Sequence, residues 1–190
     1  MAVPTTPQVP SGAIAPIDGQ KATYSAAIIG LVPGSAATDI ATLTGSASKV
    51  VKLVKVEITA TTTSATPAAL DVLLLKRSTA NTAGTSTGSP TPVAHDSANP
   101  TVSATFLAYT APPTPGTLVG TALKNDKLMM SLATATATDF PGVQKLTWIW
   151  DQAEQSPTLR GTGDVVAVNL NGATPTATAS FDIAFVWTEE

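Results

Sequence analysis

The sequence contains no cysteine and only one histidine among its 190 residues. The absence of cysteine excludes disulfide bonds, thiol chemistry and thiolate metal sites, although it does not fix the redox compartment. A single histidine also removes the usual zinc sites. The chain lacks the glycine-rich phosphate-binding motifs, the nucleophile elbow and the spacing of an EF-hand calcium loop. The sequence therefore predicts neither a cofactor nor a metal.

Charged residues are scarce as well, at 12% of the chain with a formal net charge of −3. That share is about half the usual one and offers no basic surface for a phosphate backbone, so no nucleic-acid partner is expected. No apolar run approaches the roughly 20 residues of a membrane-spanning helix, and the N-terminus lacks the pattern of a secretory signal. We therefore expect that the protein does not associate with a membrane. We expect it to be made and assembled in a cytoplasm.

Three segments near the C-terminus carry a clear period of two. Apolar side chains alternate with polar ones there, which is typical of half-buried strands because successive side chains point to opposite faces. All three tryptophans lie in these segments and in phase with the other apolar residues, so we expect them to pack in a core rather than to stack on sugars. The inward positions are Leu146, Trp148, Trp150, Val166, Val168, Leu170, Phe181, Ile183, Phe185 and Trp187.

Residues 48–63 are the one place where a helix competes with a strand. Lys49, Lys52 and Lys55 recur every third residue, as on an amphipathic helix. The many valines and the run of threonines favour a strand, because β-branched residues lose side-chain freedom in a helix. On a strand the lysines divide between two faces, so we do not expect an anion-binding stripe. On this strand we expect the side chains of Val54, Val56 and Ile58 to point inward. Those of Lys55 and Glu57 are expected to point outward.

Short strands separated by turns fill most of the remaining chain. The segment 69–77, with its run V-L-L-L, is predicted to be a central strand covered on both sides. The polar segment 78–92 is long enough to be a binding surface or a disordered excursion. Eight or nine strands without a convincing helix predict an all-β, antiparallel β-sandwich, jelly-roll-like in plan. Other strands are expected at 24–29, 38–43, 93–95, 103–109 and, one or two of them, within 118–132 around Lys124-Asn125-Asp126.

Residues 1–20 differ from the rest because prolines recur at positions 4, 7, 10 and 16. Proline restricts both itself and its predecessor to extended conformations. We expect an extended N-terminal arm that either crosses a neighbouring subunit or is a disordered tail, followed by a single β-sandwich domain over 21–190.

Few side chains offer chemistry. His95 stands next to Asp96 in a Pro/Ser/Asn-rich stretch, where adjacent side chains diverge, so an exposed loop histidine is expected rather than a catalytic one. Asp151 and Glu154 follow the tryptophan strand and are the only pair to suggest hydrolysis, but their polar turn favours solvent exposure. For Asp164 we expect a weak ion pair with Arg160. No residue is predicted to be catalytic, and the protein is not expected to be an enzyme.

The block L-L-L-K-R-S-T-A-N-T-A-G-T-S-T-G that begins at Leu73, the later A-T-F-L-A-Y-T-A-P-P-T-P-G, and the ending R-G-T-G-D-V-V-A-V-N-L-N-G with V-W-T-E-E resemble small virion proteins of tailed bacteriophages. The likeness covers about residues 51–190. The sequence departs from the pattern of these proteins after Tyr109-Thr110, where Ala111-Pro112-Pro113 stands in place of an Asn-Pro turn. Such proteins are all-β, and some resemble head decoration (cement) proteins.

The resemblance implies a structural protein of the virion, assembled in the host cytoplasm. The leading expectation is a homotrimeric decoration protein that binds the major capsid protein, or another virion protein, and stabilises the shell. A tail, baseplate or fibre-associated protein and a glycan-binding adhesive module are the alternatives.

Overall fold

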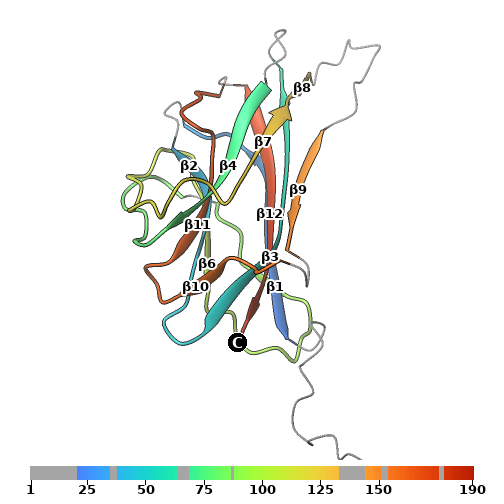
Figure 1. Ribbon diagram of the computed structural model, residues 1–190. Coiled ribbons are helices and arrows are strands. Elements are labelled where there is room, and N and C mark those ends of the chain that lie inside the picture. The colour runs from blue at the N-terminus through green and yellow to red at the C-terminus, as the bar shows by residue number, and fades with distance from the viewer. Residues whose placement is uncertain are drawn as a thin grey trace, which may run out of the picture.

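The computed structural model describes residues 21–34, 38–63, 69–86, 88–132, 144–150, 154–175 and 178–190, and the protein is an all-β sandwich over these ranges (Figure 1). They contain twelve strands and no helix, and hence no helix able to cross a membrane. The predicted all-β sandwich is confirmed. The arm expected at residues 1–20 lies outside the described residues.

Two sheets pack face to face (Figure 1). Sheet A contains β1 (Ala22–Leu31), β3 (Val50–Thr62), β5 (Val93–Ala94), β8 (Ser131–Leu132), β9 (Lys145–Ile149), β10 (Thr158–Arg160) and β12 (Ala179–Glu189). Sheet B contains β2 (Asp39–Thr44), β4 (Ala69–Arg77), β6 (Thr105–Ala108), β7 (Lys124–Met129) and β11 (Val165–Asn169). The strand predicted over 48–63 in preference to a helix is β3.

The strand order is β10-β3-β12-β1-β5 in sheet A, where β8 and β9 also pair with β3, and β6-β2-β11-β4-β7 in sheet B. Every pairing is antiparallel except the short one between β3 and β8. The main pairs are nested along the chain: β1 with β12, β2 with β11, β3 with β9 and β10, and β4 with β7. The chain is thus a long antiparallel ribbon folded over itself, with its inner surface forming the core.

The core consists of the alternating apolar side chains that the sequence pattern identifies. Trp148, Trp150 and Trp187 are 5%, 7% and 0% exposed, which confirms that they pack inside. Across the two sheets, the rings of Phe106 and Phe185 meet edge to face with their centroids 5.3 Å apart. Concentrating large aromatic surface in this way supplies much of the apolar area that folding removes from water.

The inward register predicted for β3 is wrong at one residue. Val56 and Ile58 are fully buried, but Val54 is half-exposed, and the inward positions before it are Val51 and Leu53. The register against β12 shifts between the pairs Val186–Lys55 and Trp187–Leu53, so one extra residue is accommodated there. Such a β-bulge changes which parity faces the core, and simple alternation cannot locate it.

The strand predicted at 69–77 is β4, which lies inside sheet B between β11 and β7. The more completely covered strand is β11, because all five of its residues are buried. Val165 and Ala167 alternate with the core residues Val166 and Val168 and therefore point out of the sandwich, yet they are only 1% and 0% exposed. Part of the outer side of sheet B must therefore be covered by the protein itself.

The segments after β4 and after β6 contribute to that cover. Asn81 donates to Asp39 at 2.8 Å, and the hydroxyl of Thr42, the residue opposite Ala167 in β2, donates to the Tyr109 hydroxyl at 3.5 Å. Isolated bridges join Thr82 to Thr114 and Thr85 to Ala111, so the two segments run side by side (Figure 1). The polar segment 78–92 was predicted to be a binding surface or a disordered excursion. Its first part, 78–86, is instead packed into the domain by these bridges. The one or two strands predicted within 118–132 are β7, which begins at Lys124, and β8, whereas β10 was not predicted.

Candidate functional site

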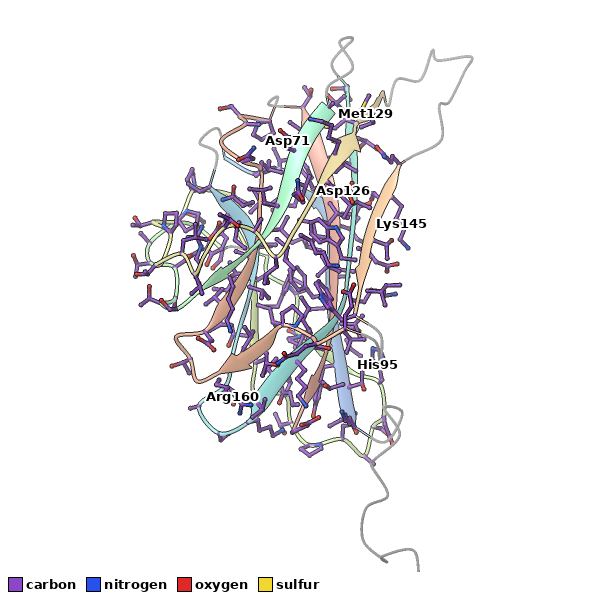
Figure 2. The ribbon with its side chains drawn as sticks, viewed as in Figure 1. Asp71, His95, Asp126, Met129, Lys145 and Arg160 are labelled. Atoms are coloured by element: carbon purple, nitrogen blue, oxygen red, sulfur yellow. The ribbon has the colours of Figure 1, made fainter. Side chains whose placement is uncertain are left out.

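The side chains considered for chemistry do not converge. His95 is exposed in the turn after β5 and holds that turn with its backbone, since its N–H donates to the Thr23 carbonyl at 2.9 Å. The Asp96 carboxylate accepts from the Ala98 N–H at 2.9 Å. Figure 2 shows His95 far from the other labelled polar residues, among them Asp71 and Arg160. This arrangement agrees with the expected exposed loop histidine.

The expected ion pair between Asp164 and Arg160 is wrong in its partner. The Asp164 carboxylate accepts from the backbone N–H of Arg160 at 2.9 Å, and its ion-pair partner is Lys76, whose Nζ lies 3.7 Å away. The pair considered for hydrolysis is Asp151 and Glu154. Asp151 lies outside the described residues, while Glu154 is exposed and pairs with Lys124 at 3.0 Å. The geometry therefore does not bring a hydrolytic pair together within the described residues.

The three lysines around β3 are each paired with a carboxylate. Lys49 contacts Glu189 at 3.2 Å, Lys52 contacts Glu190 at 2.9 Å, and Lys55 contacts Glu57 at 3.2 Å. Their charges are neutralised within the domain. The predicted division of the lysines between two faces is wrong for Lys52 and Lys55, because the bulge at Val54 places both on the outer side of sheet A. Across the described ranges, no group of three or more histidine, aspartate or glutamate side chains is arranged to hold a metal ion.

A buried ion pair fastens the loops that cover sheet B. The side chain of Asp39 is fully buried. Its carboxylate accepts two hydrogen bonds from Arg77, one from Nε at 2.6 Å and one from Nη2 at 2.7 Å, so the ion pair is bidentate. Asn81 and Asn169 donate their amide groups to the same carboxylate, each at 2.8 Å. Arg77 also donates to the carbonyl of Gly116 at 2.8 Å. The network joins β2, β4 and β11 to both covering segments, and it leaves no buried charge without a partner.

Gly116 is required at this network by close backbone packing. Its N–H donates to the Asn81 side chain at 2.9 Å, and a Cβ at this position would collide with the carbonyl of Thr79. The covering segments therefore approach each other too closely for any side chain here. This packing makes them a fixed part of the domain.

A second buried carboxylate, Glu189, fastens the crossing from β5 to β6. It accepts from the Ser103 hydroxyl at 2.6 Å, from the N–H groups of Ser103 and Ala104 at 3.0 and 2.9 Å, and from the Trp187 indole at 3.2 Å. Burial alone would raise the pKa of Glu189, but these donors, the Ser103 hydroxyl first among them, outweigh it and hold the pKa below its ordinary value. Tyr24 stacks on Trp187 and donates to the Pro100 carbonyl at 2.6 Å, which closes this end of the sandwich.

Neither carboxylate was singled out from the sequence, although one of them carries a signal. Glu189 is in phase with Phe181, Ile183, Phe185 and Trp187, and an acidic residue in an inward phase indicates a buried, fully partnered group. Asp39 carries no comparable signal, because the register of β2 against β11 shifts next to it.

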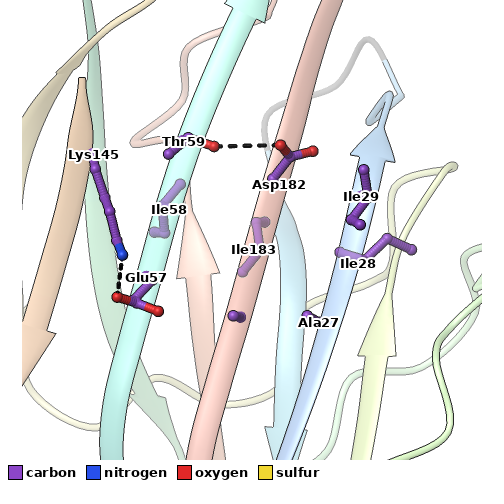
Figure 3. A pocket seen from close by; sticks show the side chains of 10 residues that line it. Ala27, Ile28, Ile29, Glu57, Ile58, Thr59, Lys145, Asp182 and Ile183 are labelled. Atoms are coloured by element: carbon purple, nitrogen blue, oxygen red, sulfur yellow. Dashed lines mark hydrogen bonds and ion pairs between the residues drawn. The ribbon is translucent and has the colours of Figure 1, made fainter. Parts of the chain in front are cut away.

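The outer face of sheet A contrasts with that of sheet B. A shallow groove crosses it, and the residues that line it include Ala27, Ile29, Glu57, Asp182 and Ala184 (Figure 3). The charged groups in it are matched within the domain. Glu57 pairs with Lys145 and with Lys55, and Asp182 accepts from the N–H of Gly30 at 2.8 Å and from the Thr59 hydroxyl at 3.5 Å. Lys145 first of all, then Lys55, holds the pKa of Glu57 below its ordinary value against the opposing effect of burial.

Exposed apolar side chains lie on the same outer side of sheet A as this groove. Ile29 on β1 is 84% exposed, Val93 on β5 is 64% exposed and Ile149 on β9 is 56% exposed. By strand alternation all three point outward from sheet A. A flat face with matched charges and apolar residues at its borders is suited to docking against another protein surface. The candidate functional site is therefore the outer face and edge of sheet A.

Comparison with known proteins adds no relative to this description. A scan against protein-family models, a search of curated proteins and a search of solved structures each found no match to the chain.

Proposed function

We propose that this protein is a structural component of a tailed-phage virion, most specifically a head decoration protein that binds the outside of the capsid and stabilises it. The nested pairing of β1 with β12, β2 with β11, β3 with β9 and β10, and β4 with β7 is the observation that carries the proposal. The sequence resemblance to small phage virion proteins is independent support.

Nested pairing of eight main strands over two sheets is the plan of a jelly roll, and we assign the domain to that plan. Jelly rolls are common among viral capsid and lectin domains. The short strands β5, β6, β8 and β10 are additions at the margins of this plan. Such a domain is rigid, because its sheets share one core and its loops are fastened by Asp39 and Glu189.

A decoration protein requires such a rigid body, a surface that resists nonspecific adhesion, and one adhesive side. The low charge content supplies the second property, and the outer face of sheet A supplies the third. We propose a homotrimer in which residues 1–20 reach the neighbouring subunit or the major capsid protein. Many weak contacts repeated by the symmetry of a shell then add up to firm attachment. In this function the protein needs no reaction, cofactor or metal.

The copy number of the protein in purified virions tests this function. A decoration protein is expected at a copy number comparable to that of the major capsid protein, measured by quantitative mass spectrometry of purified particles. A few copies per particle would instead indicate a tail, baseplate or fibre-associated protein. Absence from particles, together with a change in tryptophan fluorescence on adding oligosaccharides, would support the glycan-binding alternative.

The contribution of the arm is tested separately by deleting residues 1–18. The deletion is expected to weaken binding to heads strongly in co-sedimentation, with unchanged circular dichroism as the control for folding. If the truncated protein binds heads as tightly as the complete one, the arm has no part in docking.

A further inference from the structure

One edge of sheet A is open within the described residues. Strand β1 pairs with β12 along its length, but on its other side β5 covers only Tyr24 and Ser25. Beyond Ser25 the strand continues as Ala26-Ala27-Ile28-Ile29 without a pairing strand on that side. Natural proteins usually protect such an edge with charges, proline or a covering loop. Here the edge is apolar and Ile29 is 84% exposed.

The backbone groups at this edge can be assigned from the alternation of the strand. The Thr23 carbonyl accepts from the N–H of His95 on the β5 side. The N–H of Gly30 points the other way, toward the Asp182 carboxylate of β12. Since successive residues alternate, the N–H and C=O groups of Ala27 and Ile29 face the open side. They form a short template for one additional strand.

The 20 residues that precede Lys21 contain one segment that matches this template. Pro10 and Pro16 are an even number of residues apart, so in an extended strand both face the same way. A strand can therefore turn both prolines away from its partner, as edge strands do. The residues between them at odd positions then present N–H and C=O to the partner: Ser11, Ala13 and Ala15, followed by Ile17.

A second copy of the chain is the partner that fits this edge. Within one chain the segment would turn back at residues 18–20 and run antiparallel along β1, which places Ala15 beside Thr23 and Ala13 beside Ser25. These positions are occupied, because β5 pairs with Tyr24 and Ser25 and the N–H of His95 donates to the Thr23 carbonyl. A segment from a different copy is not tied to Lys21 and can meet the open part of the edge alone.

We propose that residues 11–17 of one copy add as a strand to the open edge of β1 in a second copy, and that this exchange holds the oligomer together. Ala27 and Ile29 exchange backbone hydrogen bonds with the odd-numbered residues of the incoming segment. Ile14 then points to the core side of the sheet and lies beside Ile28, a half-buried residue at the margin of the core. The exchange specifies how copies associate with one another and does not depend on capsid binding.

Two single prolines in the full-length protein test the exchange by parity. Ala13→Pro removes an N–H that faces the partner, whereas Gly12→Pro places a proline where the N–H faces away. We expect Ala13→Pro to raise the dissociation constant of the oligomer at least about tenfold, and Gly12→Pro to leave it within about twofold, in sedimentation equilibrium. Equal effects of the two prolines, or a monomeric parent protein, would overturn the proposal.

A second pair of variants tests the receiving edge. Ile29→Lys places a charge beside the template, and Ile149→Lys places the same charge on β9, at the other side of the same face. Both side chains are exposed, so folding is expected to be unaffected. Ile29→Lys should raise the dissociation constant of the oligomer about tenfold, and Ile149→Lys should leave the same constant unchanged. If only binding to heads changes while self-association stays intact, this inference fails and the proposed function stands.

Discussion

The two outer faces of the sandwich differ in how far the described loops cover them. Over sheet B, the segments after β4 and β6 cover Val165 and Ala167 and are fastened through Asp39 and Arg77. Over sheet A, the described residues contribute no such cover, and Ile29, Val93 and Ile149 are exposed. One face is thus completed by the protein's own loops, whereas the described residues leave the other open, and we propose that it contacts another molecule.

This difference locates function away from the most elaborate part of the molecule. The long polar loops suggest a binding surface by their length, but the buried network beneath them shows that they stabilise the domain. Over the face of sheet A, with small residues such as Ala27 and Ala184, the part of the chain that the structure describes forms no such network.

The largest effect is expected from breaking the ion pair below the loops of sheet B. Arg77→Met leaves the buried Asp39 carboxylate without its charge partner and should lower the free energy of unfolding by about 3–5 kcal/mol, measured by urea denaturation. Lys127→Ala, which removes the exposed partner of Asp71, is the control and should leave the free energy of unfolding nearly unchanged. Similar losses in the two variants would show that the covering loops are only loosely attached.

The second effect concerns Glu189 and depends on pH. Glu189→Gln replaces an ionised acceptor with a group that cannot accept all of its donors, and it should cost about 1.5–3 kcal/mol at pH 7. Because the folded-state pKa of Glu189 is lowered, the carboxylate stabilises the fold above its unfolded pKa of about 4.3. That contribution is lost as the pH falls through the lower, folded-state pKa.

Thermal unfolding between pH 2 and pH 7 checks this assignment. The parent protein and the Glu189→Gln variant should differ most at neutral pH and converge in acid. A difference between them that is independent of pH would mean that folding does not lower the pKa of Glu189.

The third effect tests the bulge in β3. Val56→Ala removes a fully buried side chain and should cost about 2 kcal/mol, whereas Val54→Ala, at the half-exposed position, should cost less than about 1 kcal/mol. Chemical denaturation of both variants measures the contrast. Equal costs would place the bulge elsewhere in the strand.

The smallest effect is expected on the face of sheet A. Lys145→Ala removes the partner of Glu57 from an exposed pair and should change the free energy of unfolding by no more than about 1 kcal/mol. A loss as large as that of Arg77→Met would mean that this face, too, is needed for folding. The two faces would then not differ as described.

Much of the fold could be predicted because it depends on alternation. The inward phase of Phe181, Ile183, Phe185 and Trp187 survives unchanged in β12, and the β-branched character of residues 48–63 correctly outweighs the spacing of the lysines. The shift at Val54 could not be predicted, since a bulge leaves no mark in the pattern of polar and apolar residues.

The candidate site was harder to predict because it depends on which strands are neighbours. That the edge of β1 is open after Ser25 follows from β5 beginning only at Val93, opposite Ser25, a property of the sheet and not of either segment alone. The partner of Asp164 was misassigned for the same reason. Arg160 is near in sequence, but the structure brings Lys76 from β4 to the carboxylate.

Amide hydrogen exchange at Ala27 and Ile29, measured at low and at high protein concentration, tests the central claim most directly. Ala167, paired on both sides within β11, is the internal reference and should exchange slowly at both concentrations. Ala27 and Ile29 should exchange rapidly in dilute solution and at least about tenfold more slowly in the concentrated, associated protein. Exchange at these two amides that does not change with concentration would contradict the assignment of this edge to assembly.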